Sequence, residues 1–425
     1  MTLIKLKEIS TKIGSGATPK GGKEAYKSKG ISLIRSMNVY DSQFKEKDLA
    51  FIDDSQAKKL SNVVVEPLDI LLNITGASVA RCCLVPEKIL PARVNQHVAI
   101  IRIDKNVADP RFIYMCMISP KYKSKLLSLA QGGATREALT KITIEEFELE
   151  LPQIITQTFI ADSYLGYDNL IENNNRRIAI LEDMAQSLYR EWFVNFRYPG
   201  HADAVDKDGN QKLIDSPLGQ IPEGWNVDEL KPFCSKIGSG ATPRGGKGAY
   251  QKEGVPLIRS MNIYDSTLIT KNLAFIDDVQ AARLKNVVVE PDDVLLNITG
   301  ASVARCSIVP SAFTPARVNQ HVAIIRLETN QLSAEYLMYT LISANGKARL
   351  LSTAQGGATR EALTKTDIEK FKIVIPPPNI IKKFNALVKN TVKQKEILFL
   401  KNENLKKQRD MLLPKLISGQ IELKD

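Results

Sequence analysis

The chain has 425 residues, about three times the size of a common domain, so we expect two or more domains. Its composition, 44% hydrophobic and 25% charged, is that of a folded globular protein and excludes wholesale disorder and fibrous repeats. No apolar run reaches the roughly 18 to 20 residues of a membrane helix, and residues 1–10 lack an apolar stretch of signal-peptide length. We therefore expect a cytoplasmic protein without a membrane partner.

The five cysteines are an odd number and include no CxxC spacing, which argues against a disulfide framework and a zinc site. We expect buried, reduced thiols and no bound metal. The cysteines are Cys82, Cys83, Cys116, Cys234 and Cys306.

A long internal repeat organises the chain. Residues 12–22 (KIGSGATPKGG) return at 236–246 (KIGSGATPRGG), an offset of 224 residues that holds without a gap from Leu6 to Pro152. Because this unit is far longer than a solenoid repeat, it is predicted to be a whole domain present twice. Short β-rich runs at 63–65, 70–74 and 98–103 and a helical run at 111–129 predict a domain of mixed α and β structure.

Each copy is followed by a segment with helical periodicity. Apolar residues recur at alternating steps of 4 and 3, the pattern of a coiled-coil helix, and Asn174 interrupts them. Neither helix can bury its stripe alone, so we expect the two to pair, with Asn174 fixing their register. The first stripe is Ile160, Tyr164, Tyr167, Ile171, Asn174, Ile178, Leu181, Ala185, Leu188 and Trp192, and the second is Phe384, Val388, Thr391, Lys395, Leu398, Asn402, Leu405, Arg409, Leu412 and Leu416.

The predicted order is therefore a first domain at 1–152, a first helix at 153–198, a polar linker with the second domain at 199–376, and a second helix at 377–425. The overall excess of 58 Lys and Arg over 47 Asp and Glu is weak evidence by itself. Along the chain, however, residues 12–152 and 236–376 each carry a net charge of +5, residues 377–425 carry +6, and the first helix and the linker are acidic. This distribution favours two domains that contact one polyanion, although a solvated helix face explains the last segment equally well.

The glycine-rich segment 14–19 (GSGATP) is followed by Lys20 and Lys23 and resembles a loop that cradles phosphate. It lacks the spacing of a nucleotide P-loop or a dinucleotide fingerprint. Contact with a nucleic-acid backbone and a plain structural turn both remain open.

Other polar motifs contain side chains suited to base edges or phosphates, because Arg and Asn make bidentate contacts with guanine and adenine. Each motif could instead be a capped turn. The predicted DNA-contact residues of the first copy are Lys20, Lys23, Arg35, Asn38, Asn73, Arg81, Gln96, His97 and Arg136, and those of the second are Arg244, Lys247, Arg259, Asn262, Asn297, Arg305, Gln320, His321 and Arg360.

No catalytic constellation accompanies these residues. His97 and His321 occupy equivalent positions, but neither belongs to a recognisable catalytic or metal-binding spacing. The tetrapeptide of DNA methyltransferases and the kinase, P-loop and hydrolase motifs are absent. We interpret the chain as a non-catalytic DNA-recognition scaffold; the alternatives are a standalone DNA-modifying enzyme with an unfamiliar site and a coiled-coil scaffold for protein interactions.

The order of these motifs resembles the specificity subunit of Type I restriction-modification systems. GSGATP near the start, NITGASVAR in the middle, VNQH before a strand and GGATR before a proline-led helix all contribute, and the resemblance covers essentially the whole chain. It implies two target-recognition domains separated by two long antiparallel helices with pseudo-twofold symmetry. It also implies that the helices hold two modification subunits, which carry S-adenosylmethionine and methylate adenine, and that a restriction subunit docks on this assembly.

Members of that family usually carry two dissimilar recognition domains, whereas here they are near copies, so we expect near-equal half-sites. With antiparallel helices the half-sites would be inverted, and with parallel helices they would be direct repeats. The 32 residue steps from Ile160 to Trp192 span about 48 Å as a helix. This length limits the distance between half-site centres to about 14 base pairs, and one DNA turn of about 10 pairs lies within the limit.

Overall fold

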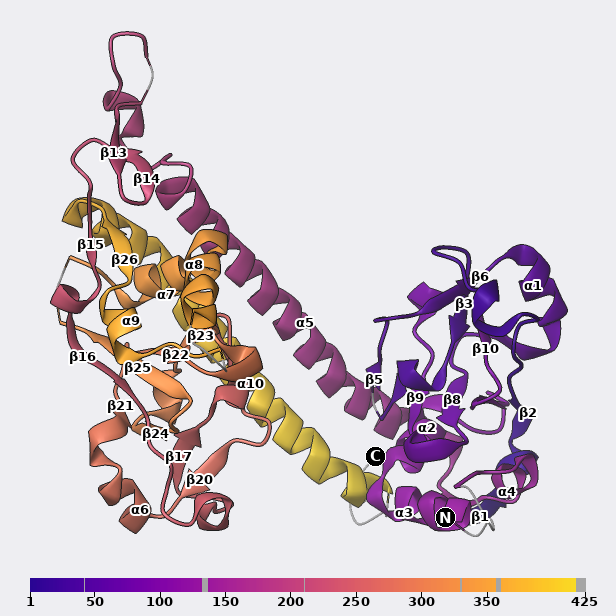
Figure 1. Ribbon diagram of the computed structural model, residues 1–425. Helices are drawn as coiled ribbons and strands as arrows, with labels where there is room; N and C mark the ends of the chain where they lie inside the picture. Colours follow the sequence, from indigo (N-terminus) through magenta and orange to yellow (C-terminus); the bar gives the residue numbers. More distant parts are fainter. Residues whose placement is uncertain (42, 132–136, 210, 329–330, 357–360, 418–425) are drawn as a thin grey trace. The chain divides into compact units, whose positions relative to one another are not determined.

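The computed structural model describes the chain except for residues 42, 132–136, 210, 329–330, 357–360 and 418–425. The chain forms two compact units (Figure 1): unit 1 contains Met1–Asn173 and Lys401–Asp425, and unit 2 contains Asn174–Leu400. The two long helices, α5 (Ile154–Phe193) and α10 (Pro378–Ile417), begin within two residues of the predicted starts and contribute to both units. Each unit thus holds one copy of the repeat and part of each helix.

Unit 1 is built around two four-stranded sheets. The first has the strand order β6-β3-β10-β7 and the second β2-β11-β8-β9, and two-stranded pairs form between β1 and β12 and between β4 and β5. The parallel pair in the first sheet joins β3 and β10, while the second sheet is antiparallel throughout. The strands are β1 (Thr2–Lys5), β2 (Ser10–Ser15), β3 (Ile31–Ile34), β4 (Val39–Tyr40), β5 (Gln43–Phe44), β6 (Ala50–Ile52), β7 (Val64–Val65), β8 (Ile70–Asn73), β9 (Cys82–Leu84), β10 (Ala92–Val94), β11 (Val98–Ile103) and β12 (Glu148–Leu151).

The second sheet is buried on both faces, which explains its uninterrupted apolar runs. Alternate strand residues point to opposite faces. Ile70 and Ile101 accordingly join a core with the helices, while Leu71 and Ile100 join a core with the first sheet. The predicted β runs are therefore confirmed as strands β7, β8 and β11, apart from Val63 and Ile74 at their ends.

The helices of unit 1 are α1 (Asp54–Lys59), α2 (Pro110–Ile118), α3 (Pro120–Gln131) and α4 (Lys141–Glu145). The single helix predicted at 111–129 is wrong, because the chain breaks between α2 and α3. Ser119 has φ −67° and ψ 149°, outside the helical region. Pro120 disfavours a helical conformation for the residue before it, and proline is well placed in the first turn of the next helix.

Unit 2 repeats this architecture. Its four-stranded sheets have the orders β20-β17-β24-β21 and β16-β25-β22-β23, with pairs between β15 and β26 and between β18 and β19. The strands are β15 (Asn226–Glu229), β16 (Cys234–Ser239), β17 (Val255–Ile258), β18 (Ile263–Tyr264), β19 (Thr267–Leu268), β20 (Ala274–Ile276), β21 (Val288–Val289), β22 (Val294–Asn297), β23 (Cys306–Ile308), β24 (Ala316–Val318), β25 (Val322–Leu327) and β26 (Lys372–Ile375). The short helices are α6 (Asp278–Arg283), α7 (Ala334–Ile342), α8 (Ala344–Gln355) and α9 (Lys365–Glu369).

The segment predicted as a polar linker is partly folded onto unit 2. It contains the hairpin β13 (Leu213–Ser216) and β14 (Gly219–Pro222) and includes β15. Trp225 is buried, and its ring lies 5.1 Å from that of Tyr198 and 6.0 Å from that of Phe193. The acidic composition of the segment favoured the prediction of a linker, although the segment contains aromatic residues that pack into the core of unit 2.

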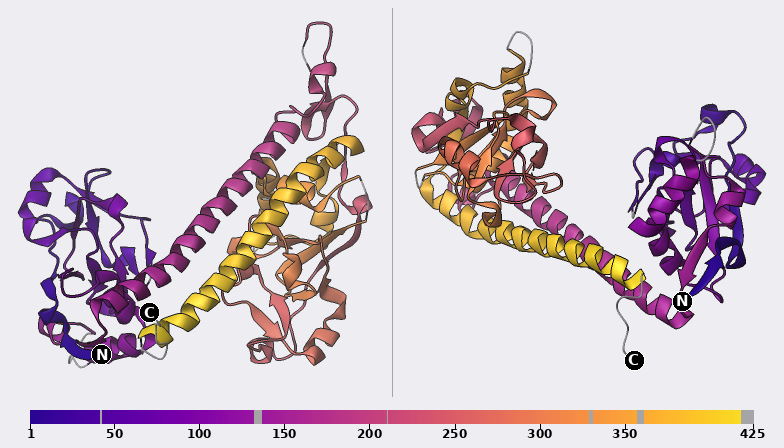
Figure 2. Two further views of the ribbon diagram at one scale, coloured as in Figure 1. Left: turned by 180° about the vertical axis from the view of Figure 1, so that it is seen from behind. Right: turned by 90° about the horizontal axis from the view of Figure 1, so that it is seen from below.

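In unit 1, α5 and α10 lie side by side and run in opposite directions (Figure 2). Asp168 of α5 pairs with Arg409 of α10 at 2.6 Å. One turn further along α5, the carbonyl of Ile171 accepts a hydrogen bond of 3.5 Å from the side-chain Nδ2 of Asn402. From the first contact to the second, the residue number increases along α5 and decreases along α10, so the pairing is antiparallel. The ends of the two helices share the unit 1 core, where Ile160 and Tyr164 cluster with Leu413 and Leu416.

Unit 2 shows the same antiparallel pairing. Glu182 of α5 pairs with Lys395, and further along α5 the ring of Trp192 lies 6.0 Å from that of Phe384. All predicted stripe residues of both helices are buried or half-buried, which confirms both the period and the pairing. Among the polar residues of the two stripes, Lys395 and Asn402 are buried, whereas Asn174, predicted to fix the register, is only half-buried.

All five cysteines are free thiols, as expected. Cys234 is half-buried and the others are buried, and burial raises the pKa of Cys83 to about 12. Within the described residues, no helix is long and apolar enough to cross a membrane.

Candidate nucleic-acid interface

The glycine-rich segment is a structural turn rather than an open anion cradle. The backbone N–H of Gly16 donates to the carbonyl of Val98 at 2.9 Å, and that of Ala17 donates to the carbonyl of Val94 at 3.1 Å. A Cβ at Gly16 would overlap the carbonyl oxygens of Val94 and Asn95, so close backbone packing requires glycine there. These amides cannot hold phosphate. The exposed side chains that follow the turn, Lys20 and Lys23 with Arg244 and Lys247 in unit 2, keep their predicted role as phosphate contacts.

Gln96 and His97 belong to a small polar network. Thr75 Oγ1 lies 2.7 Å from Nδ1 of His97, and Gln96 Nε2 lies 3.1 Å from Nε2 of the same ring. The hydroxyl of Thr18 donates to the side-chain carbonyl oxygen of Gln96. Unit 2 repeats the network with Thr242, Thr299, Gln320 and His321. Because both ring nitrogens of each histidine have partners, these residues fix three loops against one another. The two threonines of each unit were missed as network members, although they lie within the repeated motifs.

The four predicted asparagine contacts are not supported. Asn38, Asn73, Asn262 and Asn297 have no exposed surface. Asn38 Nδ2 donates to the carbonyl of Lys45 at 2.9 Å, and Asn73 Nδ2 donates to that of Ser36 at 2.9 Å. Asn262 and Asn297 make the same bonds in unit 2. These amides hold neighbouring loops from the inside and cannot reach a base from these positions.

Arg35 and its equivalent Arg259 also bond to the backbone of a neighbouring loop, each through part of its guanidinium group. One guanidinium nitrogen of Arg35 donates to the carbonyl of Asp48, its Nε is buried, and the group lies 5.4 Å from the centre of the Tyr26 ring. Arg259 bonds to the carbonyl of Asn272 and lies 5.2 Å from the Tyr250 ring. These arginines chiefly support a loop.

Arg81 and Arg305 are differently placed. The guanidinium of Arg81 lies 4.8 Å from the centre of the Tyr40 ring, and that of Arg305 lies 4.3 Å from the Tyr264 ring. Neither group makes a hydrogen bond or ion pair to another side chain in the part of the chain that the structure describes. Stacking on tyrosine holds such a guanidinium in place and leaves its N–H donors for a ligand. Tyr40 and Tyr264 were missed as supporting residues. The sequence shows a tyrosine at the same place in both copies, but its arginine partner lies far along the chain, so only the structure reveals the stacking.

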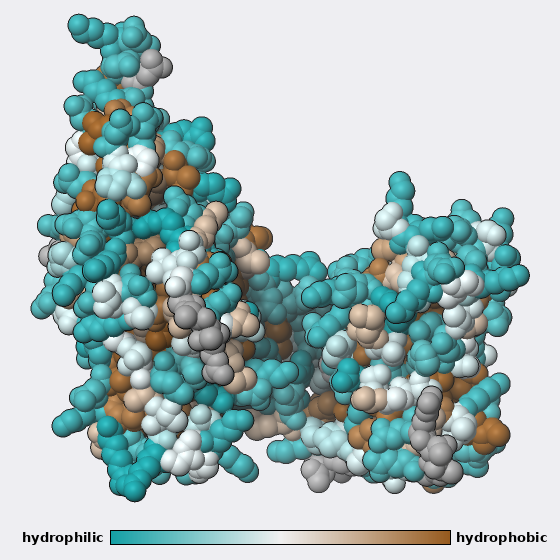
Figure 3. All heavy atoms as spheres, viewed as in Figure 1, coloured by the Kyte–Doolittle hydropathy of each residue, from teal (hydrophilic) through white to brown (hydrophobic). Residues whose placement is uncertain are grey.

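Charge neutralisation separates these cations from the structural ones. Arg102 is bound through two hydrogen bonds of 2.8 Å to the buried Asp69, and the hydrogen bonds raise the pKa of Arg102. Arg326 and Asp293 form the same pair in unit 2. Such pairs cancel their own charge, so attraction for a polyanion comes from the unpaired cations. The visible face of each unit is mainly hydrophilic (Figure 3).

Arg136 and Arg360, the last two predicted contacts, lie outside the described residues. The structure therefore places the remaining candidates in two groups. The first group can still offer donors to a ligand: Lys20, Lys23, Arg244 and Lys247 are exposed, and Arg81 and Arg305 are half-buried on tyrosine rings. The second group is bonded within the domain: Arg35, Asn38, Asn73, Gln96, His97, Arg259, Asn262, Asn297, Gln320 and His321, of which Gln96 and Gln320 are themselves exposed.

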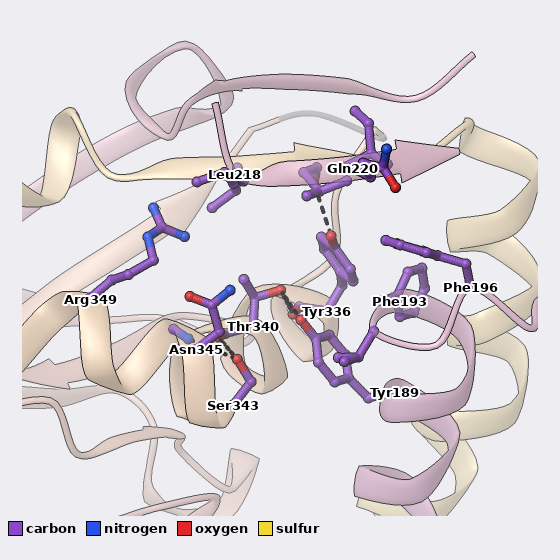
Figure 4. Close-up of a pocket in the computed structure, with 15 residues that line it drawn as sticks. Tyr189, Phe193, Phe196, Leu218, Gln220, Tyr336, Thr340, Ser343, Asn345 and Arg349 are labelled. Atoms are coloured by element: carbon purple, nitrogen blue, oxygen red, sulfur yellow. Dashed lines mark hydrogen bonds between the residues drawn. The ribbon is translucent and has the colours of Figure 1, made fainter. Parts of the chain in front are cut away.

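Unit 2 also contains a pocket of about 230 Å³ between the end of α5, helices α7 and α8, and strand β14 (Figure 4). Tyr189 donates to Thr340 Oγ1 at 3.2 Å, Tyr336 donates to the carbonyl of Val374 at 2.8 Å, and Arg349 lines the opposite side. Burial raises the pKa of Tyr189 to about 12, so its hydroxyl stays protonated. None of the predicted DNA-contact residues lines this pocket. Among the described residues, no three His, Cys, Asp or Glu side chains gather as a metal site would require.

Comparisons with known proteins match the whole length of this architecture. The family model described as the Type I restriction modification DNA specificity domain matches twice, at residues 1–183 and 222–406. The MjaIX specificity subunit of Methanocaldococcus jannaschii is 29% identical over 331 residues, covering 76% of this chain and 72% of that protein. The HindI specificity subunit of Haemophilus influenzae is 21% identical, covering 92% of this chain and 94% of that protein. The crystal structure of the S subunit from M. genitalium has the same fold, with a TM-score of 0.64 at 13% identity, covering 100% of this chain and 96% of that one.

Proposed function

The chain belongs to the Type I restriction-modification DNA specificity family, and from this premise we propose that it reads a bipartite, near-palindromic DNA site. Its role is that of the DNA-recognition subunit of a restriction-modification complex, not of a catalytic subunit. Family membership favours this function over a standalone DNA-modifying enzyme or a general coiled-coil scaffold.

The observation that carries the proposal is the repetition of one set of donors that are available to a ligand. Arg81 on Tyr40 in unit 1 has its counterpart in Arg305 on Tyr264 in unit 2, and Lys20 and Lys23 have theirs in Arg244 and Lys247. Two domains that present nearly the same donors should read nearly the same half-site.

The helix pairing supports inverted half-sites. Unit 1 packs its repeat copy on the start of α5 and the end of α10, and unit 2 packs its copy on the start of α10 and the end of α5. The helices exchange roles between the units and run antiparallel in each. A twofold axis that related one domain and its helix to the other would require the helices to exchange roles in this way. Two recognition domains related by a twofold axis match an inverted repeat in DNA. We retain the predicted half-site separation of about 10 base pairs, within the limit of about 14.

The partners follow from the same proposal. The complex contains double-stranded DNA and other restriction-modification subunits. We propose that the paired helices hold two modification subunits and that a restriction subunit docks on them. The cytoplasmic location stays a prediction that accords with these partners.

We propose further that S-adenosylmethionine binds to the modification subunits and not to this chain. Calorimetric titration of the cofactor into the purified chain should show no micromolar binding, whereas the assembled complex should bind it. Micromolar binding by the chain alone would contradict the division of labour.

A DNA-binding titration tests the recognition role itself. The complex should bind its target with an affinity that falls steeply as salt rises, and should discriminate strongly against unrelated duplexes. A complex whose sequence preference is unchanged when this chain is replaced by a different specificity subunit would contradict the proposal.

A further inference from the structure

The two copies differ sharply in one short surface segment beside the stacked arginines. Residues 43–48 (QFKEKD) and 267–272 (TLITKN) differ at five of six positions, while the flanking RSMN and AFIDD motifs are identical. We infer that this segment, above all Lys45 against Ile269, makes the two half-sites differ at one or two adjacent base pairs. The inference rests on the proposed function and specifies which base contacts differ.

The backbone of the segment is held by the same bonds in both units. In unit 1 the N–H of Lys45 donates to the carbonyl of Asn38 at 2.8 Å, and Asn38 Nδ2 returns a bond to the Lys45 carbonyl at 2.9 Å. In unit 2 the corresponding bonds join Ile269 and Asn262 at 2.7 and 2.9 Å.

The far end of the segment is fixed equally in both units. Asp48 and Asn272 both have φ of 59°, and their carbonyls accept hydrogen bonds from Arg35 and Arg259. Because these backbone bonds are shared, the side chains of Lys45 and Ile269 are not needed to shape the loop. They change what the loop presents, whereas Phe44 and Leu268, which also differ, pack toward the cores of their units.

What it presents differs in chemical kind. Lys45 is exposed, and its ammonium lies 3.7 Å from the centre of the Tyr40 ring, the same ring on which Arg81 stacks. In unit 2 the equivalent Ile269 is 37% exposed and Tyr264 is 44% exposed, so an apolar surface lies beside Arg305.

A second difference between the copies also places charge in unit 1 and uncharged residues in unit 2. Glu46 pairs with Lys88 in unit 1, and the equivalent residues in unit 2 are Thr270 and Ala312, so neither charge has a counterpart. Unit 1 therefore presents charged groups at the place where unit 2 presents uncharged ones.

These two surfaces suit different base pairs in the major groove. A lysine donates to O6 and N7 of guanine, whereas an aliphatic side chain contacts the thymine methyl group. We therefore assign a G·C pair to the half-site read by unit 1 at the position where the half-site read by unit 2 has an A·T pair. The flanking positions, contacted by donors common to both units, should be equal.

Methylation sequencing of DNA modified by the intact complex tests this assignment with two reciprocal variants, Lys45→Ile and Ile269→Lys. Both substitutions are on exposed side chains, and the matched control Lys271→Ala changes the lysine that both copies share. Lys45→Ile should shift preference at one position of one half-site by about fivefold or more toward A·T, making the site more nearly palindromic. Ile269→Lys should shift the equivalent position of the other half-site toward G·C.

The outcomes separate the inference from the function on which it rests. A weaker complex with an unchanged recognition sequence in both variants would mean that Lys45 contacts phosphate, and would overturn the inference. Shifts at positions elsewhere in the half-site would also overturn it. If the unmodified complex showed no sequence-specific methylation at all, the proposed function itself would fail.

Discussion

Lys395 of α10 pairs with Glu182 of α5 in unit 2, where the two side chains are only 10% and 17% exposed. Removing one partner of a buried ion pair leaves a charge without compensation, while replacing both with apolar residues is often neutral. We expect Glu182→Leu or Lys395→Leu to destabilise the protein by about 2–4 kcal/mol and the double variant to recover most of the loss. Chemical denaturation measures all three, with the more exposed pair Lys141–Glu145 as a control that should change little. Additive losses in the double variant would contradict a coupled pair.

A charge in the helix seam should disrupt both folding and assembly. Ile171 is 7% exposed, whereas Ile180 on the same helix is 60% exposed. Ile171→Asp would bury a carboxylate without a partner and should cost roughly 3 kcal/mol or more, with loss of binding to the modification subunits. Size-exclusion chromatography of the mixed subunits gives the readout. The control Ile180→Asp should keep its fold, and intact assembly of Ile171→Asp would exclude the seam as the organising element.

The half-buried Arg81 and the fully buried Asn38 should respond differently to alanine. Arg81→Ala should leave stability nearly unchanged, weaken DNA binding by the complex, and either reduce the salt slope by about one or relax one base position. Asn38→Ala removes a buried loop support and should instead lower the free energy of unfolding by about 1–3 kcal/mol. Parallel DNA titrations and denaturation curves separate the two effects, with Lys121→Ala on α3 as the control. Unchanged DNA affinity for Arg81→Ala together with Arg305→Ala would show that the assigned donors are wrong.

Asp109 should make unit 1 sensitive to acid. Burial disfavours its charge, but hydrogen bonds from Arg111 outweigh burial and hold the pKa of Asp109 below its usual range. A carboxyl with a lowered pKa stabilises the folded state fully above the unfolded pKa, and this contribution is lost as pH falls through the folded value. At pH 7 Asp109→Asn should therefore be less stable than the natural chain by about 1–3 kcal/mol, and the gap should shrink below pH 4. A gap that stayed constant from pH 7 to pH 2 would rule out this titration.

The large-scale organisation could be predicted because it depends on repetition. An ungapped offset of 224 residues and a stripe with alternating steps of 4 and 3 are properties of the sequence itself, and the structure confirms both. The break at Ser119 could also have been predicted, because Pro120 follows it. The apolar pattern on both sides of the break favoured a single helix instead.

The roles of the polar residues were harder to predict because the same side chains serve recognition and loop support. Asn38 and Arg81 both lie in donor-rich motifs, yet Asn38 is buried against the carbonyl of Lys45 while Arg81 stacks on Tyr40. Which of them faces solvent depends on contacts between distant loops, and no local spacing reveals these contacts. Lys45 is not among the predicted contacts because it lies outside the repeated motifs. Its difference from Ile269 becomes informative because the structure shows that both loops share one backbone support.

Single-molecule methylation sequencing of DNA from a host with and without this gene tests the central claim most directly. The account predicts a bipartite site with two inverted, nearly equal half-sites, centred about 10 base pairs apart and methylated on both strands, that disappears when the gene is deleted. Two unrelated half-sites, a direct repeat, or methylation that persists without the gene would contradict it.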